Sequence, residues 1–139
     1  MALFEGNTAK PIADGEIELT AEEVVDFSHW PVTVMTPPKW KDEYMDFYQY
    51  EVKRRGERYA LVLDVRNTIK PNPKERKKLT EAMQKSEFNQ KYCVCTALVF
   101  SSAIMRGILT AVFWLHKPKY PIKVFATPEA AIEWAKTMF

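Results

Sequence analysis

The chain alternates between continuous apolar runs and segments whose apolar residues recur every three or four positions. The continuous runs, at residues 59–65, 92–100 and 122–125, predict strands that are buried on both faces. The periodic segments predict amphipathic helices, each with one face packed on a core. The predicted helices are residues 36–55, 73–88 and 102–116, with a last helix from residue 128.

Local capping signals support these boundaries. Thr127 and Pro128 form a favourable pair of N-cap and first helical residue, and Asn72 and Pro73 repeat the pattern at an earlier helix. Gly56 follows the first long helix, where a left-handed C-terminal residue is favoured.

The N-terminal third predicts a hairpin. Two β-rich runs, residues 24–27 and 32–35, flank a short turn that ends at Pro31. We expect residues 1–20 to form an arm or an edge strand, and residues 21–139 to form a single domain. Because strands then alternate with helices, we expect an α/β fold with a mainly parallel sheet of four or five strands and helices on both faces.

Composition narrows the classes of function. The 139 residues are 47% hydrophobic and 27% charged, as in ordinary globular domains. A net charge of +2 gives no reason to expect nucleic acid as a partner. The first residues lack the basic start and apolar core of a secretory signal, so we expect a cytoplasmic protein.

The apolar stretch at residues 97–115 has nearly the length of a membrane span. Ser101 and Ser102 interrupt it, and a charge such as that of Arg106 is costly in lipid. We therefore expect a strand followed by a helix, and no membrane span.

The two cysteines, Cys93 and Cys95, stand two apart in a predicted strand. Their side chains share a face at a separation that does not suit a disulfide, so we expect reduced residues in the core. A metal site would need further ligands, and the histidines are only two, His29 and His116. No metal or cofactor is predicted.

Four motifs occur between residue 59 and the end of the chain. They are LVLDVRN at 61–67, SSAIMRGILTA at 101–111, FWL at 113–115 and VFATPEAA at 124–131. In these motifs the chain resembles the SpoIIAA-like group of bacterial proteins, which have a STAS-type (sulfate transporter and anti-sigma-factor antagonist) fold. The resemblance implies a SpoIIAA-like fold and a non-enzymatic regulatory module that docks onto a protein partner.

The resemblance also implies where a switch would lie. Anti-sigma-factor antagonists dock onto a kinase and are switched off by phosphorylation in an Asp-Ser-x-Gly-type motif after a central strand. The corresponding stretch, residues 64–70, has neither Ser nor Gly. Thr68 supplies the only hydroxyl there, while Arg66 and Asn67 replace the usual small residues.

Polar residues follow two neighbouring predicted strands, at the edge where α/β sheets bind ligands. They are Arg66, Asn67 and Thr68 after one strand, Ser101 and Ser102 after the next, and Arg106 one turn into the following helix. A helix N-terminus with hydroxyls and arginines predicts a site for a small anionic ligand. Alternatively, Asp64 or Glu75 pairs with Arg106, and Ser102 only caps the helix.

The predicted helix at residues 102–116 is apolar nearly all round, so it either lies buried in the monomer or contacts a partner. Its least apolar stripe holds Arg106, Thr110, Phe113 or Trp114, and Lys117. We expect an interface, with a second copy or another protein, at Phe113, Trp114, Pro118 and Tyr120.

Signals for catalysis are weak. The four glycines are scattered, which excludes a glycine-rich phosphate loop, and no nucleophile motif occurs. The first hypothesis from the sequence is a non-enzymatic regulatory or protein-interaction module, and its alternative is a binding protein for a small anionic ligand. A third hypothesis is an enzyme whose catalytic residues the sequence does not reveal.

Overall fold

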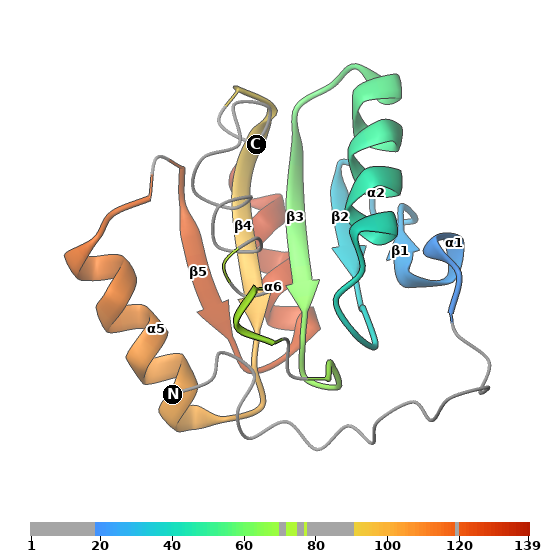
Figure 1. The fold of residues 1–139 in the computed structure, drawn as a ribbon. Helices are drawn as coiled ribbons and strands as arrows, with labels where there is room; N and C mark the ends of the chain where they lie inside the picture. The colour runs from blue at the N-terminus through green and yellow to red at the C-terminus, as the bar shows by residue number, and fades with distance from the viewer. Residues whose placement is uncertain (1–18, 70–71, 75–76, 78–90, 119) are drawn as a thin grey trace.

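A computed structural model describes residues 19–69, 72–74, 77, 91–118 and 120–139 of the chain (Figure 1). Its helices are α1 (Ala21–Val24), α2 (Asp42–Arg55), α5 (Ala103–Leu115) and α6 (Pro128–Lys136). Its strands are β1 (Val25–Asp26), β2 (Val32–Met35), β3 (Tyr59–Asp64), β4 (Cys93–Val99) and β5 (Ile122–Phe125).

The five strands form one sheet in the order β1-β2-β3-β4-β5. Strand β1 is antiparallel to β2, and the other neighbouring pairs are parallel. This confirms the predicted α/β class, the mainly parallel sheet and the hairpin. Because each parallel strand lies next to the one before it, right-handed crossovers place the connecting helices on one face.

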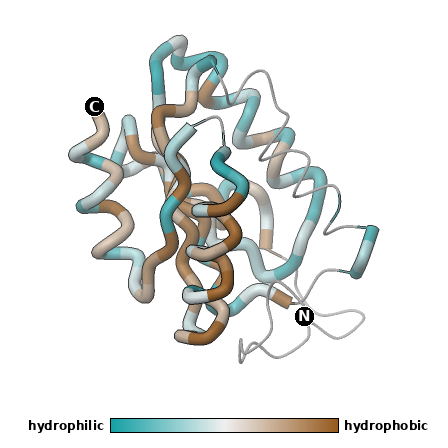
Figure 2. The backbone as a smooth tube through the Cα atoms, turned by 90° about the vertical axis from the view of Figure 1, so that its left-hand side faces the viewer, coloured by the Kyte–Doolittle hydropathy of each residue, from teal (hydrophilic) through white to brown (hydrophobic). Residues whose placement is uncertain are grey.

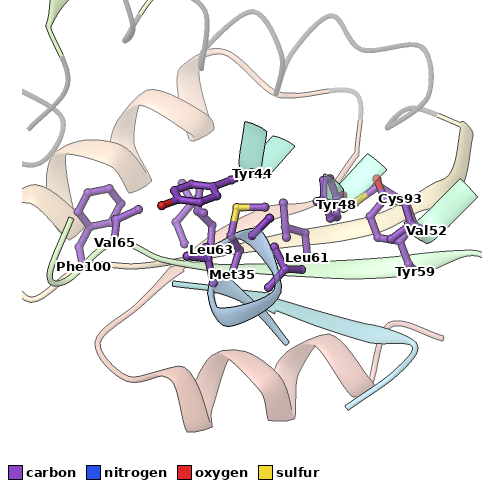
Figure 3. Packing of buried hydrophobic residues seen from close by; sticks show 14 of the residues in the cluster. Met35, Tyr44, Tyr48, Val52, Tyr59, Leu61, Leu63, Val65, Cys93 and Phe100 are labelled. Carbon is purple, nitrogen blue, oxygen red and sulfur yellow. The ribbon is translucent and has the colours of Figure 1, made fainter. Parts of the chain in front are cut away.

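The two faces of the sheet have separate cores. On the first, α2 and α5 cover the sheet, and the buried side chains shown in Figure 3 include Tyr44 and Tyr48 of α2 and Leu61 and Leu63 of β3. On the second, α6 packs behind the sheet (Figure 1), with Ala131 and Ala135 fully buried against small and branched strand residues. The predicted cover of helices on both faces is therefore confirmed.

Residues that the sequence predicts to cap helices do so in the structure. The Thr127 hydroxyl accepts a hydrogen bond from the Ala130 backbone N–H at 3.3 Å, and Pro128 opens α6. Gly56 ends α2 with φ +69°, a left-handed conformation that favours glycine. The strand predicted at residues 122–125 has the same bounds in the structure.

Two predicted boundaries near the N-terminus are wrong. Residues 21–24 form the short helix α1, capped by Thr20, so the first strand begins only at Val25. Helix α2 begins at Asp42 and not at residue 36. Thr36 instead extends the hairpin, because its backbone N–H donates to the Val24 carbonyl at 3.0 Å, and Pro37 restricts the residue before it to extended conformations.

Other predictions are only partly covered by the structure. Nearly all of the predicted arm at 1–20 and most of the predicted helix at 73–88 lie outside the described residues. Within the described ranges, no helix is long and apolar enough to cross a membrane. Cys93 and Cys95 are free and buried, as expected.

Candidate functional site

The carboxyl ends of β3 and β4 bring the predicted site residues to one edge of the sheet. The two strands are parallel, with Asp64 opposite Val99, and the Val65 backbone N–H donates to the Val99 carbonyl at 3.1 Å. Residues 66–68 and residues 101–102 therefore follow neighbouring strands at the same edge, as the sequence predicts.

At this edge Arg66 is held by Asp64. The guanidinium Nε and Nη2 donate to the two carboxylate oxygens of Asp64 at 2.9 Å each, and the backbone N–H of Arg66 donates to Oδ1 at 3.2 Å. The hydrogen-bonded carboxylate raises the pKa of Arg66, with a smaller contribution from the charge of Glu129 in α6. Arg66 therefore lies toward the α6 face of the sheet.

Thr68 ties the loop after β3 to the segment before α2. Its side chain is buried, with 3% exposed, and its hydroxyl donates to the Pro37 carbonyl at 2.5 Å. The Ile69 backbone N–H donates to the Pro38 carbonyl at 2.8 Å. A phosphate on Thr68 would require this buried bond to break, whereas neighbouring Asn67 is exposed.

Ser102 and Arg106 form hydrogen bonds with the backbone around the start of α5. The Ser102 hydroxyl accepts from the Met105 backbone N–H at 3.2 Å and so caps the helix. Arg106 Nη1 donates to the carbonyls of Phe100 at 2.7 Å and Ser101 at 3.1 Å. These bonds satisfy the last carbonyls after β4.

The two arginines are held by different parts of the chain. Strand residues alternate in direction, so Leu63 and Val65 belong to the α5 face while Asp64 belongs to the α6 face with Arg66. Arg106 is part of α5. Its predicted pairing with Asp64 is wrong because Arg66 occupies that carboxylate, and the other predicted partner, Glu75, lies outside the described residues.

Helix α5 turns an apolar face outward. Met105 and Leu109 are buried against the sheet, whereas Ile104 is 71% exposed, Trp114 76% and Leu115 69%. Figure 2 views the molecule from the side on which α5 lies and shows hydrophobic residues along this helix. Of the predicted stripe, Thr110, Trp114 and Lys117 are exposed and Arg106 is partly buried, and the apolar face extends beyond the stripe.

Of the residues predicted for an interface, Trp114 is the most exposed. Phe113 and Pro118 are partly buried, and Tyr120 belongs to the core with 7% exposed. Sequence reasoning missed Ile104, Ile108 and Leu115. Their helical spacing was a usable signal, but it did not reveal which side of an apolar helix meets the sheet.

A groove of about 570 Å³ lies between α5 and β5. Gly107, Ala111 and Trp114 line it from the helix, and Ile122 and Val124 from the strand. Within the described parts of the chain, no three His, Cys, Asp or Glu residues gather closely enough to hold a metal ion.

Comparison with known proteins places the chain in a family. The family model described as a domain of unknown function, DUF7793, matches residues 49–139, which include β3, β4, α5, β5 and α6. No curated protein and no solved structure matches the chain. The match covers well over half of the sequence, so the chain belongs to the DUF7793 family.

Proposed function

We propose that the protein is a non-enzymatic regulatory module that works by docking α5 onto another protein surface. The observation that carries the proposal is the outward apolar face of α5, with Ile104, Trp114 and Leu115 each more than two-thirds exposed. Monomeric proteins rarely leave a continuous apolar face of this kind in water, and such faces usually mark a contact with another molecule.

The hydrogen bonds of the polar residues at the carboxyl ends of β3 and β4 support the same proposal. The polar groups with which an α/β enzyme would act are engaged within the chain: Arg66 with Asp64, Thr68 with Pro37, and Arg106 with two carbonyls. A regulatory role also agrees with the resemblance of the motifs to STAS-type proteins. The usual phosphorylation switch has little support, because Thr68 is buried and hydrogen-bonded.

Binding of a small anionic ligand at this edge has less support. It requires Arg66 and Arg106 to converge near Ser102, and both guanidinium groups are already hydrogen-bonded within the chain, Arg66 to Asp64 and Arg106 to the Phe100 and Ser101 carbonyls. A phosphate titration followed by amide NMR shifts tests it directly. Shifts at Asn67, Ser102 and Ala103 that saturate would favour the ligand-binding function over the docking one.

The docking function is tested by comparing surface variants. Ile104→Glu places a charge on the α5 face, and Tyr50→Glu makes the same change at an exposed aromatic residue of α2. We expect the wild type and Tyr50→Glu to retain the same protein from an extract of the source cells, and Ile104→Glu to lose it. Equal retention by all three would overturn the proposal.

A further inference from the structure

The outward face of α5 has the spacing of a coiled-coil seam. Ile104, Ile108, Ala111 and Leu115 follow one another at intervals of four, three and four residues, which is the a/d pattern of helix pairs. All four side chains are exposed. A helix that carries this seam on its solvent side is suited to pack against another helix.

The seam carries no charge. The only ionisable residue between Ala103 and Leu115 is Arg106, which is turned inward to the Phe100 and Ser101 carbonyls. Along the seam itself a charged partner would find nothing to pair with; the charge beside it is that of Lys123, which lines the groove between α5 and β5. A second copy of the chain meets it without like-charge repulsion.

The exposed area is close to what a stable pair requires. Ile104, Trp114 and Leu115 are 69–76% exposed, and Ile108 and Val112 are each 39% exposed. Their combined apolar surface is on the order of 600 Å², at the upper end of what monomers leave in water. Each partner in a stable complex buries about 800 Å², which this helix and its surroundings can supply.

We propose that two copies of the chain pair through α5, with the two helices antiparallel about a two-fold axis midway between Leu109 and Thr110. The inference rests on the proposed docking function and names its partner as a second copy of this chain. In this register Ile108 lies beside Ala111 of the partner subunit, and Ile104 lies beside Leu115 of the partner subunit. The axis passes near the middle of α5, so the seam pairs along its whole length.

Gly107 and Trp114 explain the antiparallel direction. Both lie on the same flank of the seam and line the groove between α5 and β5. Helical side chains lean toward the N-terminus of their own helix, so Trp114 of the partner subunit leans toward Gly107. A Cβ at Gly107 meets no atom within 4 Å, which leaves room for the indole. A parallel pair would instead place Trp114 on the opposite flank of the seam from Gly107 of the partner subunit.

Sedimentation velocity on the full chain tests the pairing. Gly107→Leu adds apolar surface and favours helix formation, so a face that is merely hydrophobic would associate more strongly. The proposed pairing predicts the reverse: at least tenfold weaker dimerisation, because leucine fills the space for Trp114, with no loss of thermal stability in the monomer. Trp114→Gln should weaken the dimer, and Tyr50→Gln, at the exposed aromatic residue of α2, should not.

Cross-linking with a short bismaleimide tests the direction of the helices. In the antiparallel register the two copies of residue 111 are offset by about 4.5 Å along the axis and those of residue 104 by about 16 Å. Ala111→Cys should therefore cross-link and Ile104→Cys should not, while the buried native thiols of Cys93 and Cys95 stay unreacted. Equal cross-linking at both positions would overturn the antiparallel arrangement.

The two proposals fail in different ways. A wild-type chain that stays monomeric at all concentrations, or a Gly107→Leu chain that dimerises as well as the wild type, overturns the paired helices. If retention of another protein is still lost in Ile104→Glu, the docking function stands without a second copy.

Discussion

At the scale of single residues, Thr68 shows how one buried hydroxyl joins two parts of the chain that are distant in the sequence. It follows β3, donates to Pro37 after the hairpin, and lies beside the loop whose Ile69 backbone N–H reaches Pro38. These bonds fix the path of residues 37–41 across the strand-end edge before α2 begins.

We predict that Thr68→Val destabilises the protein by about 1–3 kcal/mol. Valine keeps the volume of threonine but leaves the buried Pro37 carbonyl without its donor, and an unsatisfied buried group costs about this much. Urea unfolding measures the change. Thr110→Val is the control, since the Thr110 hydroxyl donates to the Arg106 carbonyl from an exposed position. Similar losses in both variants would contradict the role assigned to Thr68.

Cys95 should make stability depend on pH. Burial raises the pKa of its thiol from 9.0 to about 12. Between these values the unfolded chain has released the proton and the folded chain still holds it, so the free energy of unfolding falls as pH rises. One such thiol contributes a slope of up to about 1.4 kcal/mol per pH unit.

The contribution of Cys95 is isolated by a variant, because burial also raises the pKa of Cys93, Tyr48 and Tyr59. We expect urea unfolding of Cys95→Ala, measured from below pH 9 into the alkaline range, to lose stability less steeply than the wild type. Parallel curves for the two proteins would show that the Cys95 thiol is not protected by burial.

At the scale of elements, Arg106 determines how α5 is attached to the sheet. Its guanidinium crosses back to the carbonyls of Phe100 and Ser101, so the only charge of the helix is used at the turn that leads into it. The polar residue of the helix consequently points inward at its start, and the apolar residues Ile104 and Ile108 point outward.

We predict that Arg106→Met loosens the start of α5. The change removes two hydrogen bonds from a charged donor, which should lower the free energy of unfolding by about 1.5–3 kcal/mol. Amide hydrogen exchange should also be faster at Met105 and Arg106 than later in the helix. Arg54→Met removes an exposed pair with Glu51 on α2 and should cost much less, because solvent screens exposed ion pairs. Equal losses in the two variants would refute the anchoring role.

The elements also show what the sequence could and could not predict. Gly56 and the Thr127–Pro128 cap were found because their signals act within a few residues. The start of α2 was misplaced because Pro37 and Pro38 accept hydrogen bonds from Thr68 and Ile69, which lie about thirty positions away in the sequence.

For a similar reason, part of the outward face of α5 was missed. Its rotation depends on bonds between Arg106 and the strand-end carbonyls, which no local pattern encodes. The same holds for Arg66: its place after a strand was predicted, but its pairing with Asp64 on the α6 side was not. The position of the candidate site could therefore be predicted, whereas the directions of its side chains could not.

At the scale of the whole molecule, the exposure of α5 follows from the winding of the sheet. Each crossover advances the sheet by one strand in the same direction, so the last crossover, through α5, lies over the edge strand β5. Figure 1 shows α5 at this end of the sheet. Its inner residues pack on β5, and among the described residues no further strand follows β5 against which its outer residues could pack.

Dimerisation through α5 would make the stability of the protein depend on its concentration. If the folded chains dimerise and the unfolded chains do not, each tenfold rise in concentration stabilises the dimer by about 1.4 kcal/mol. For two chains of 139 residues this corresponds to a rise of about 2 °C in Tm. We expect calorimetry of the wild type to show this dependence. At concentrations where sedimentation shows Gly107→Leu to be a monomer, its Tm should not change with concentration, because the monomer unfolds with α5 intact. A wild-type Tm that is equally constant would mean that the folded chain gains nothing from a second copy, and that its apolar helix face serves a different protein.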